Sequence, residues 1–207
     1  MACDLRFERR LWKKGVSLVA GIDEAGRGPL AGPVVAAAAI LPAGFSVVGV
    51  DDSKQLTETV REELFDALVA PGALLFYGVG MAEAAEIDRV NILQATYLAM
   101  RRAVATLPVQ PEHVLIDGLP VPAFPRPQTA VVGGDGRSLS IAVASIIAKV
   151  TRDRIMRNWH SEFPRYDFYH NKGYGTPAHL ESLQIHGPCS IHRRSFAPVA
   201  QTYFTFH

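Results

Sequence analysis

The chain has 207 residues, 48% of them hydrophobic, and a formal net charge of +1 at neutral pH. That length and composition predict a globular protein with one sizeable core. No apolar run approaches the roughly 20 residues that cross a bilayer, and no signal-type segment follows the polar residues 1–14, so we expect no membrane association. Two cysteines far apart in the sequence, Cys3 and Cys189, do not predict a disulfide framework, which favours a reducing, cytoplasmic location.

The small net charge hides a division along the chain. Acidic residues dominate residues 51–88, whereas basic residues dominate residues 149–194, where five of the seven histidines also lie. A basic segment of this kind can bind a phosphate backbone. It can equally be a helix surface that is neutralised by acids of the same protein, and charge alone leaves both interpretations open.

Short apolar runs bounded by Gly and Pro turns predict strands. The first three runs follow one another closely, which favours antiparallel pairing because parallel neighbours need a long crossover. The predicted strands are residues 17–22, 33–41, 46–50, 73–79, 113–116 and 129–132.

Apolar residues at helical spacing predict helices between and after these strands. The sequence from Thr59 to Glu62 has the spacing of a capping box and places a helix start there. The predicted helices run from about residue 59 to 69, 91 to 106, 140 to 156 and 178 to 184. Strands and helices in this order predict an α/β protein with a helical C-terminal portion.

Acidic residues recur where the predicted strands end. Asp23 and Glu24 follow the first strand, Asp117 follows a later one, and Asp135 lies just past another. If these ends converge, the carboxylates repel one another unless cations are bound. Mg²⁺ suits such a set, because it binds one or two carboxylates together with waters and phosphate oxygens, and paired ions serve phosphoryl transfer. Taken singly, each acid is more typical of a turn.

Seven motifs in fixed order give these acids a context. They are GIDEAGRGPLAGPVV from Gly21, DSKQL from Asp52, IDRVNI from Ile87, LIDG from Leu115, GD followed by SIAVASIIAKVTRDR up to Arg154, NKGYGT from Asn171, and HRRSF from His192. This series resembles the ribonuclease HII, or type 2 ribonuclease H, family, and the resemblance extends from Gly21 to Phe196.

The resemblance implies a ribonuclease H-like fold with a mixed five-stranded sheet flanked by helices. It implies a single catalytic domain over residues 1–207, with a helical substrate-binding portion from about residue 155 onward. The implied activity is endonucleolytic cleavage of RNA in RNA–DNA hybrids and nicking 5′ to single ribonucleotides in duplex DNA. Such cleavage leaves 3′-hydroxyl and 5′-phosphate ends and would serve the removal of ribonucleotides and RNA primers.

By motif, the four metal-binding acids of the family fall on Asp23, Glu24, Asp117 and Asp135, which would hold two Mg²⁺ or Mn²⁺ ions. Asp153 is a rival for the fourth position, but it lies about a dozen residues into a predicted helix, whereas the family's acid lies in a GD turn. The chain departs from the family at Gly133, where many relatives have Lys.

Further residues are implied to bind the substrate. Glycine backbones without Cβ atoms can approach a sugar closely, so the Gly26-Arg27-Gly28 loop suits recognition of the 2′-hydroxyl. In the family this loop contacts the ribonucleotide, and the tyrosine that matches Tyr174 packs on the neighbouring deoxyribose. Candidate phosphate contacts are Lys54, Lys149, Lys172 and Arg194, although surface lysines are commonly just solvated.

Three other interpretations compete with this one. A dinucleotide-binding domain would use Gly26, Gly28 and Gly32 with Asp51-Asp52, but the third glycine is one residue late and two acids precede the turn. A non-catalytic hybrid-binding module would not need four acids or depend on metal. A zinc site at His186, Cys189 and His192 lacks a fourth ligand. We expect a monomer, in which the aromatic tail from Gln201 to Phe206 could bind a sliding clamp or dock on its own domain.

Overall fold

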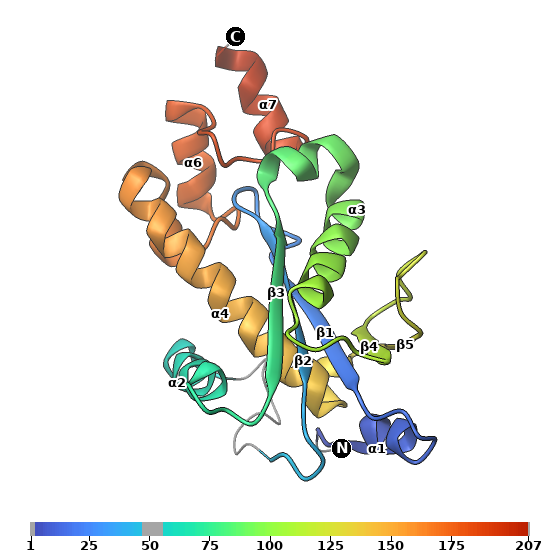
Figure 1. Cartoon of the computed structure of the whole chain (residues 1–207). Helices are drawn as coiled ribbons and strands as arrows, with labels where there is room; N and C mark the ends of the chain where they lie inside the picture. Colours follow the sequence, from blue (N-terminus) through green and yellow to red (C-terminus); the bar gives the residue numbers. More distant parts are fainter. Residues whose placement is uncertain (1–2, 47–55, 207) are drawn as a thin grey trace.

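A computed structural model describes residues 3–46 and 56–206 and contains one mixed sheet (Figure 1). The order of its strands is β3-β2-β1-β4-β5. The pairs β1–β2 and β2–β3 are antiparallel, while β1–β4 and β4–β5 are parallel. The strands are β1 (Val19–Ala25), β2 (Val34–Ile40), β3 (Phe76–Ala82), β4 (His113–Asp117) and β5 (Gln128–Val131). The prediction of a mixed five-stranded sheet is confirmed.

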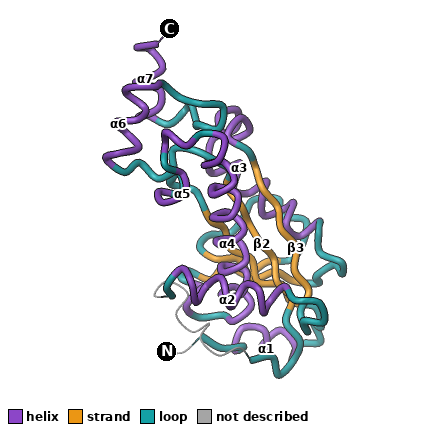
Figure 2. The backbone as a smooth tube through the Cα atoms, turned by 90° about the vertical axis from the view of Figure 1, so that its left-hand side faces the viewer, coloured by secondary structure: helices purple, strands orange, loops and turns teal. Residues whose placement is uncertain are grey.

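Helices cover both faces of the sheet and form the end of the molecule that lies beyond it (Figures 1 and 2). They are α1 (Arg6–Trp12), α2 (Glu58–Val69), α3 (Ala84–Ala105), α4 (Leu139–Glu162), α5 (Phe168–Asn171), α6 (Pro177–His186) and α7 (Ala197–Phe206). Short 3-10 turns span Gly134–Gly136 and Pro164–Tyr166.

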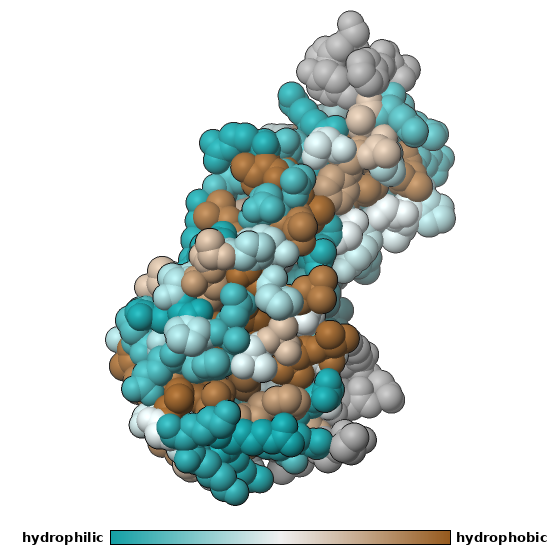
Figure 3. Space-filling model, turned by 90° about the vertical axis from the view of Figure 1, so that its right-hand side faces the viewer, coloured by the Kyte–Doolittle hydropathy of each residue, from teal (hydrophilic) through white to brown (hydrophobic). Residues whose placement is uncertain are grey.

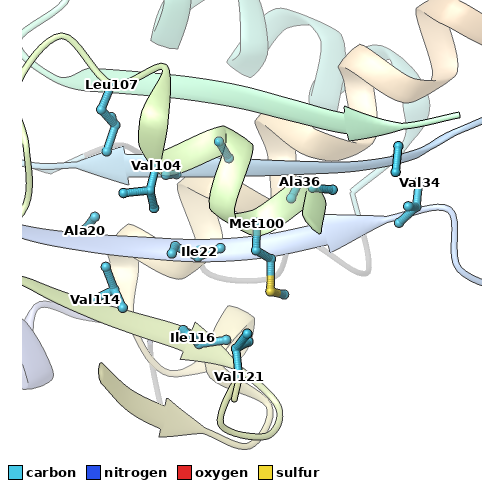
Figure 4. Packing of buried hydrophobic residues seen from close by; sticks show 14 of the residues in the cluster. Ala20, Ile22, Val34, Ala36, Met100, Val104, Leu107, Val114, Ile116 and Val121 are labelled. Atoms are coloured by element: carbon cyan, nitrogen blue, oxygen red, sulfur yellow. The ribbon is translucent and has the colours of Figure 1, made fainter. Parts of the chain in front are cut away.

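The sequence of β2, VVAAAAI, explains how close the layers lie. All seven residues are buried, because α4 covers one face of the strand and α3 covers the other. Figure 4 shows the α3 side of this packing, where Met100 and Val104 lie over Ile22 and Ala36. Small side chains in β2 let both helices approach the sheet, and burial of these apolar surfaces is the main stabilising contribution.

Gly21 on β1 lies directly against the backbone of α4. A Cβ atom at this position would lie 2.2 Å from the carbonyl carbon of Ser140 and 2.3 Å from the nitrogen of Ile141. Only glycine therefore allows the first turn of α4 to rest on β1, two residues before Asp23.

The helical C-terminal portion packs on a third set of buried side chains. Met156 at the far part of α4 meets Phe168 and Leu183, and the segment before β2 adds Leu30. Figure 2 shows α5, α6 and α7 gathered at the end of the molecule opposite α1 and α2. This portion is therefore joined to the sheet through α4 and the segment between β1 and β2.

The third early strand, predicted at 46–50, lies almost wholly outside the described residues, so that prediction stays untested. Among the described strands, β3 pairs with β2 on the side away from β1. Several predicted helix boundaries were wrong for identifiable reasons. The N-cap of α2 is Thr57, whose hydroxyl accepts from the amide of Val60, rather than Thr59. Helix α3 begins at Ala84 because Glu83 and Glu86 form a capping box, and the helix kinks at Asn91, whose φ is +69°. Helices α1, α5 and α7 were not among the individually predicted helices.

No helix in the described part of the chain is long and apolar enough to cross a membrane. The face that carries α3 has hydrophilic and hydrophobic residues interspersed (Figure 3).

Candidate active site

The parallel strands bring three acid-bearing segments to one edge of the sheet. Ile22 of β1 is level with Ile116 of β4, so the next residues, Asp23 and Asp117, are neighbours across the two strands. Asp117 is in turn level with Val131 at the end of β5. Asp23 and Glu24 lie within β1 rather than after it, since the strand continues to Ala25. The predicted convergence of strand ends is therefore observed.

Asp135 is held by the turn that follows β5. The backbone amide of Gly134 donates to Oδ1 of Asp117 at 2.6 Å, and the amide of Gly136 donates to Oδ1 of Asp135 at 3.0 Å. A Cβ on Gly134 would lie 3.2 Å from that Asp117 oxygen. The turn thus binds the carboxylate of the neighbouring strand directly, which places Asp135 beside Asp117.

Asp23 and Glu24 share a desolvated environment. The amide of Glu24 donates to Oδ1 of Asp23 at 2.7 Å, and Ser145 on α4 also hydrogen-bonds the Asp23 carboxylate. Burial, followed by the charges of Glu24 and Asp117, raises the pKa of Asp23 well above its usual range. Burial also raises the pKa of Glu24, although Arg27 opposes it through an ion pair of 3.1 Å. Without a cation, these carboxylates therefore hold protons more tightly than exposed acids do.

The four acids line one cavity of about 430 Å³, which is within the range of ligand-binding sites. Gly26, Lys149 and Tyr174 line the same cavity, so seven of the predicted site residues meet there. Four lining residues were not predicted, and two of them are polar, namely Arg61 on α2 and Ser145 on α4. Ser145 lies among the small residues of the SIAVASIIAK motif, one helical turn before Lys149. That spacing places its hydroxyl on the same side of the helix as Lys149, and this was the signal in the sequence that could have identified it. The cavity is lined by Asp23, Glu24, Ala25, Gly26, Arg61, Asp117, Asp135, Ser145, Ile146, Lys149 and Tyr174.

The donors in this cavity suit a hard divalent cation. The candidate ligand atoms are carboxylate oxygens, with the Ser145 hydroxyl nearby, and neither Cys nor His is among the lining residues. Such oxygen sets favour Mg²⁺ or Mn²⁺ over zinc. Within residues 3–46 and 56–206, no three His, Cys, Asp or Glu side chains are arranged as a metal site. Mg²⁺ needs only one or two carboxylates, because it keeps waters and takes further oxygens from a substrate phosphate.

Asp153, the rival fourth acid, lies on α4 outside the lining of this cavity. Its side chain is buried and accepts from Nζ of Lys149 at 2.7 Å, in an i,i+4 ion pair. Asp153 therefore sets the position of a lysine that lines the cavity.

The Gly26-Arg27-Gly28 loop and Tyr174 lie next to each other at the cavity. A Cβ on Gly28 would be 3.8 Å from Cε1 of Tyr174, and the amide of Leu30 donates to the carbonyl of Gly173 at 2.8 Å. The Tyr174 side chain is 45% exposed. An exposed ring beside a loop whose glycines carry no side chains can contact a sugar.

Two of the remaining predicted phosphate contacts, Lys172 and Arg194, do not line the cavity. Lys172 is buried, and its ammonium group donates to the carbonyl of Tyr169 and lies 3.3 Å from Glu58. Arg194 is exposed, and its backbone amide donates to Asp88. Lys54 lies outside the described residues. Of the candidates that the structure describes, Lys149 alone lines the cavity.

The acidic and basic parts of the chain partly neutralise each other. Arg154 on α4 contacts Glu62 at 2.5 Å and Asp66 at 2.7 Å on α2, and Arg157 contacts Glu58 and Glu62. For this part of α4, the helix-surface interpretation of the basic segment is confirmed.

Two residues of the suspected zinc site, Cys189 and His192, form a chain of hydrogen bonds with His179 instead. The amide of Cys189 donates to Nδ1 of His192 at 3.0 Å, so Nε2 of His192 carries the proton and donates to Nε2 of His179 at 2.9 Å. Nδ1 of His179 then donates to the carbonyl of Tyr174 at 2.8 Å. His186 is exposed at the end of α6 and takes no part.

This chain of bonds predicts an acid sensitivity of folding. Burial, then the neighbouring His179, lowers the pKa of His192 to about 3. In the unfolded chain the same group binds a proton below about pH 6.5. The unfolded state therefore binds more protons between these values, and stability is lost as the pH falls, by at most about 1.4 kcal/mol per pH unit from this group.

We expect urea unfolding to show a weaker acid dependence for His192→Asn than for the wild type between pH 6.5 and 4. The exposed His186→Asn variant is the matched control and should keep the wild-type dependence. Equal pH dependence in all three proteins would show that His192 is not held neutral in the folded state.

A family model described as Ribonuclease HII matches residues 20–199. The chain belongs to the ribonuclease HII family. A curated relative, Ribonuclease HII of Desulfitobacterium hafniense (strain DSM 10664 / DCB-2), is 56% identical over 197 residues, which are 95% of this chain and 75% of the relative.

Solved structures of this family share the fold. The ribonuclease H2 of Pyrococcus horikoshii OT3 superposes with a TM-score of 0.78 at 29% identity and covers 91% of this chain and 98% of its own. The ribonuclease HII in a PCNA complex from Archaeoglobus fulgidus gives a TM-score of 0.70 at 25% identity, with 86% and 95% covered. The predicted ribonuclease H-like fold is confirmed.

Membership of the ribonuclease HII family makes the protein an endoribonuclease with ribonuclease H activity on RNA–DNA hybrids. The family generally uses divalent metal ions. The alternatives of a dinucleotide-binding domain and a non-catalytic module were wrong. In the first case, the chain after Gly28 enters β2, antiparallel to β1, instead of the helix that would bind a pyrophosphate.

Proposed function

We propose that the protein nicks duplex DNA on the 5′ side of a single embedded ribonucleotide, in addition to cutting RNA–DNA hybrids. The carboxylates of Asp23, Glu24, Asp117 and Asp135 would hold two Mg²⁺ or Mn²⁺ ions. The observation that carries the proposal is the cavity in which these four acids lie beside the Gly26 loop. Recognition of the sugar and hydrolysis of the phosphodiester would then occur side by side.

Bound divalent ions supply two things in such a site, a nucleophilic water at neutral pH and neutralisation of charge on the phosphate. The chain's own residues orient the acids. Ser145 and the amide of Glu24 hold the Asp23 carboxylate, and the amide of Gly134 holds that of Asp117. Lys149 and Arg61 bring positive charge to the cavity, which suits a phosphate group. Cleavage with these groups would leave 3′-hydroxyl and 5′-phosphate ends.

Selection of the ribonucleotide would depend on the Gly26-Arg27-Gly28 loop. Backbone groups of this loop can hydrogen-bond the 2′-hydroxyl, the group that distinguishes RNA from DNA. Tyr174 would pack on the deoxyribose next to it, and its exposed ring beside Gly28 supports this role. The two contacts together would recognise an RNA–DNA junction.

Gly133 stands where many relatives have a lysine, and another basic residue lies close to this position. Arg137 follows in the same turn and donates to the carbonyl of Val132 at 3.1 Å. Its exposed side chain would contact a phosphate of the duplex, and the exposed Arg194 would contact another. The helical portion from about residue 155 would carry the rest of the duplex contact.

The expected setting is a monomer in the cytoplasm that removes ribonucleotides and RNA primers. The two cysteines are not joined in a disulfide, as suits a reducing compartment. The PCNA complex of the Archaeoglobus relative supports a sliding-clamp contact through the C-terminal tail. Truncation at Gln201 would test that contact without touching the cavity.

The test compares labelled duplexes that carry no ribonucleotide, one ribonucleotide or several in succession, with Mg²⁺ or Mn²⁺. We expect cleavage of both ribonucleotide-containing duplexes, none of the all-DNA duplex, and none of any duplex in chelator. Asp23→Asn is the inactive control. Cleavage of long RNA–DNA hybrids alone, with the single-ribonucleotide duplex left intact, would refute the proposed specificity.

A further inference from the structure

We propose that Arg152 and Arg193 are positioning residues that fix the peptide planes of the Gly26-Arg27-Gly28 loop, so that the loop turns N–H donors toward the substrate. This inference rests on the proposed role of the loop in recognising a ribonucleotide. Two arginines behind the loop would then contribute to the specificity for a ribonucleotide.

Both arginines are buried without a carboxylate bonded to them. Their side chains are 1% and 0% exposed, and no ion pair joins either guanidinium to an acid in the described part of the chain. A buried charge is normally paired, because desolvation costs several kcal/mol per ion. These two guanidinium groups instead donate to backbone carbonyls, three each, nearly all between Gly26 and Pro33.

Arg193 holds the recognition loop itself. It donates to the carbonyls of Gly26 at 2.6 Å, Arg27 at 2.9 Å and Gly32 at 3.0 Å. The planar guanidinium has donors on three nitrogens in a fixed fork, so it can bind carbonyls that a single ammonium group cannot reach together. One side chain thus sets the direction of two successive peptide groups.

The direction of these carbonyls decides what the loop presents outward. In a planar trans peptide the C=O and the following N–H point to opposite sides. Because the carbonyls of Gly26 and Arg27 point inward to Arg193, the N–H groups of Arg27 and Gly28 point away from it. Neither N–H has an acceptor among the residues that the structure describes. The loop therefore offers two adjacent donors to an oxygen of the ligand.

Arg152 fills the space behind the same loop and ties it to Tyr174. A Cβ on Gly26 would lie only 1.9 Å from Nε of Arg152, and Gly26 has a φ of +92°. Arg152 also donates to the carbonyls of Ala31, Pro33 and Lys172, at 3.1, 3.0 and 2.9 Å. Its guanidinium lies 6.0 Å from the ring of Tyr174. The Arg152 side chain thus contacts both the loop segment and Tyr174 and holds them in position relative to each other.

The charge of the two arginines adds to the effect of geometry. Burial lowers the pKa of Arg152, and burial followed by Arg152 lowers the pKa of Arg193 to about 9, which leaves both charged at neutral pH. Asp153 near Arg152 and Asp88 near Arg193 offset the charge only in part. Positive charge behind N–H donors strengthens their attraction for hydroxyl and phosphate oxygens.

The experiment measures discrimination between two duplexes that differ by one 2′-hydroxyl. The KM for the single-ribonucleotide duplex is compared with the inhibition constant of the all-DNA duplex as a competitor. The discrimination ratio is the inhibition constant of the all-DNA duplex divided by the KM for the single-ribonucleotide duplex. Arg193→Gln is expected to lower this ratio by about tenfold, the effect of losing one hydrogen bond. The KM should rise, with little change in the all-DNA inhibition constant. Val199→Ala, in the nearby C-terminal core, is the control for lost stability. It should lower thermal stability without altering the ratio.

Arg193→Lys separates geometry from charge. It keeps a buried cation that cannot reach all three carbonyls, so we expect it to lose discrimination as Arg193→Gln does. A wild-type ratio in either variant would overturn the inference while leaving the proposed function in place. Inability of the wild type to cleave the single-ribonucleotide duplex would instead refute the proposed function.

A measurement on the wild type keeps the inference testable if both variants fail to fold. Hydrogen exchange at the amides of Arg27 and Gly28 should be slowed by the single-ribonucleotide duplex and not by the all-DNA duplex, in the presence of Ca²⁺ as a non-activating probe ion. Equal protection by the two duplexes would overturn the inference.

Discussion

Replacement of Asp117 by Asn is expected to lower turnover by at least about a thousandfold while the protein stays folded. The change is nearly isosteric and keeps the oxygen that accepts from the amide of Gly134. It removes a charge that would hold a divalent ion, and such ions contribute several kcal/mol of transition-state stabilisation. At 1.36 kcal/mol for each tenfold change in rate, that loss gives a thousandfold or more.

The same variant should not unfold more easily in the absence of metal. The charge of Asp117 contributes to the raised pKa of both Asp23 and Glu24, so its removal relieves repulsion in the cavity. Steady-state cleavage and thermal unfolding in chelator provide the two measurements, with Asp66→Asn on the surface of α2 as the control. A variant that turns over at even a tenth of the wild-type rate would mean that Asp117 does not hold a metal ion in catalysis.

Gly21→Ala is expected to have the largest effect on stability, about 3 kcal/mol or more. The added Cβ would overlap the backbone of Ser140 and Ile141, which cannot move without lifting the first turn of α4 from β1. Overpacking in a close-packed core costs about 1–3 kcal/mol, and a backbone contact offers no side-chain rearrangement to reduce it. Displacement of α4 would also move Ser145 away from Asp23.

Urea unfolding provides the measurement, with Gly136→Ala as the matched control. A Cβ at Gly136 would meet no atom within 4 Å, so that variant should change stability by no more than about 0.5 kcal/mol. Unfolding of Gly21→Ala at the wild-type urea concentration would show that α4 does not lie as close to β1 as the structure has it.

The acids of the cavity could be found from the sequence because their positions follow from local rules. Apolar runs end near acidic residues, and the carboxyl ends of parallel strands meet at one edge of a sheet. The order of the motifs then indicated which of these acids belong to one site. The parallel pairing of β1 with β4 and of β4 with β5 supplies the physical reason that Asp23, Asp117 and Asp135 converge.

The roles of the basic residues could not be read from the sequence. Arg152 and Arg154 are two residues apart on one helix, yet Arg152 is buried on backbone carbonyls while Arg154 pairs with Glu62 and Asp66 on α2. A helical rotation of about 200° separates them, but which side faces the protein depends on how α4 crosses the sheet. Lys172 was predicted to contact phosphate, and it is buried for the same kind of reason.

Helix α1 shows a second limit of local patterns. Its seven residues carry four charges, and its three apolar residues, Phe7, Leu11 and Trp12, make only a short pattern. The helix is held by packing of these side chains on the core and by a distant contact, in which the buried Glu8 accepts from the hydroxyls of Ser138 and Ser140 at the start of α4. Such a contact is 130 residues away in sequence and gives no signal in a local window.

The fourth acid is the most direct test of the proposed metal site. Cleavage of the single-ribonucleotide duplex should be measured for Asp135→Asn and Asp153→Asn in parallel, with Mg²⁺ varied. Asp135 lines the cavity and Asp153 only holds Lys149, so the first variant should be inactive and the second should retain most of its activity. A fully active Asp135→Asn together with an inactive Asp153→Asn would contradict the assignment of the metal site to Asp23, Glu24, Asp117 and Asp135.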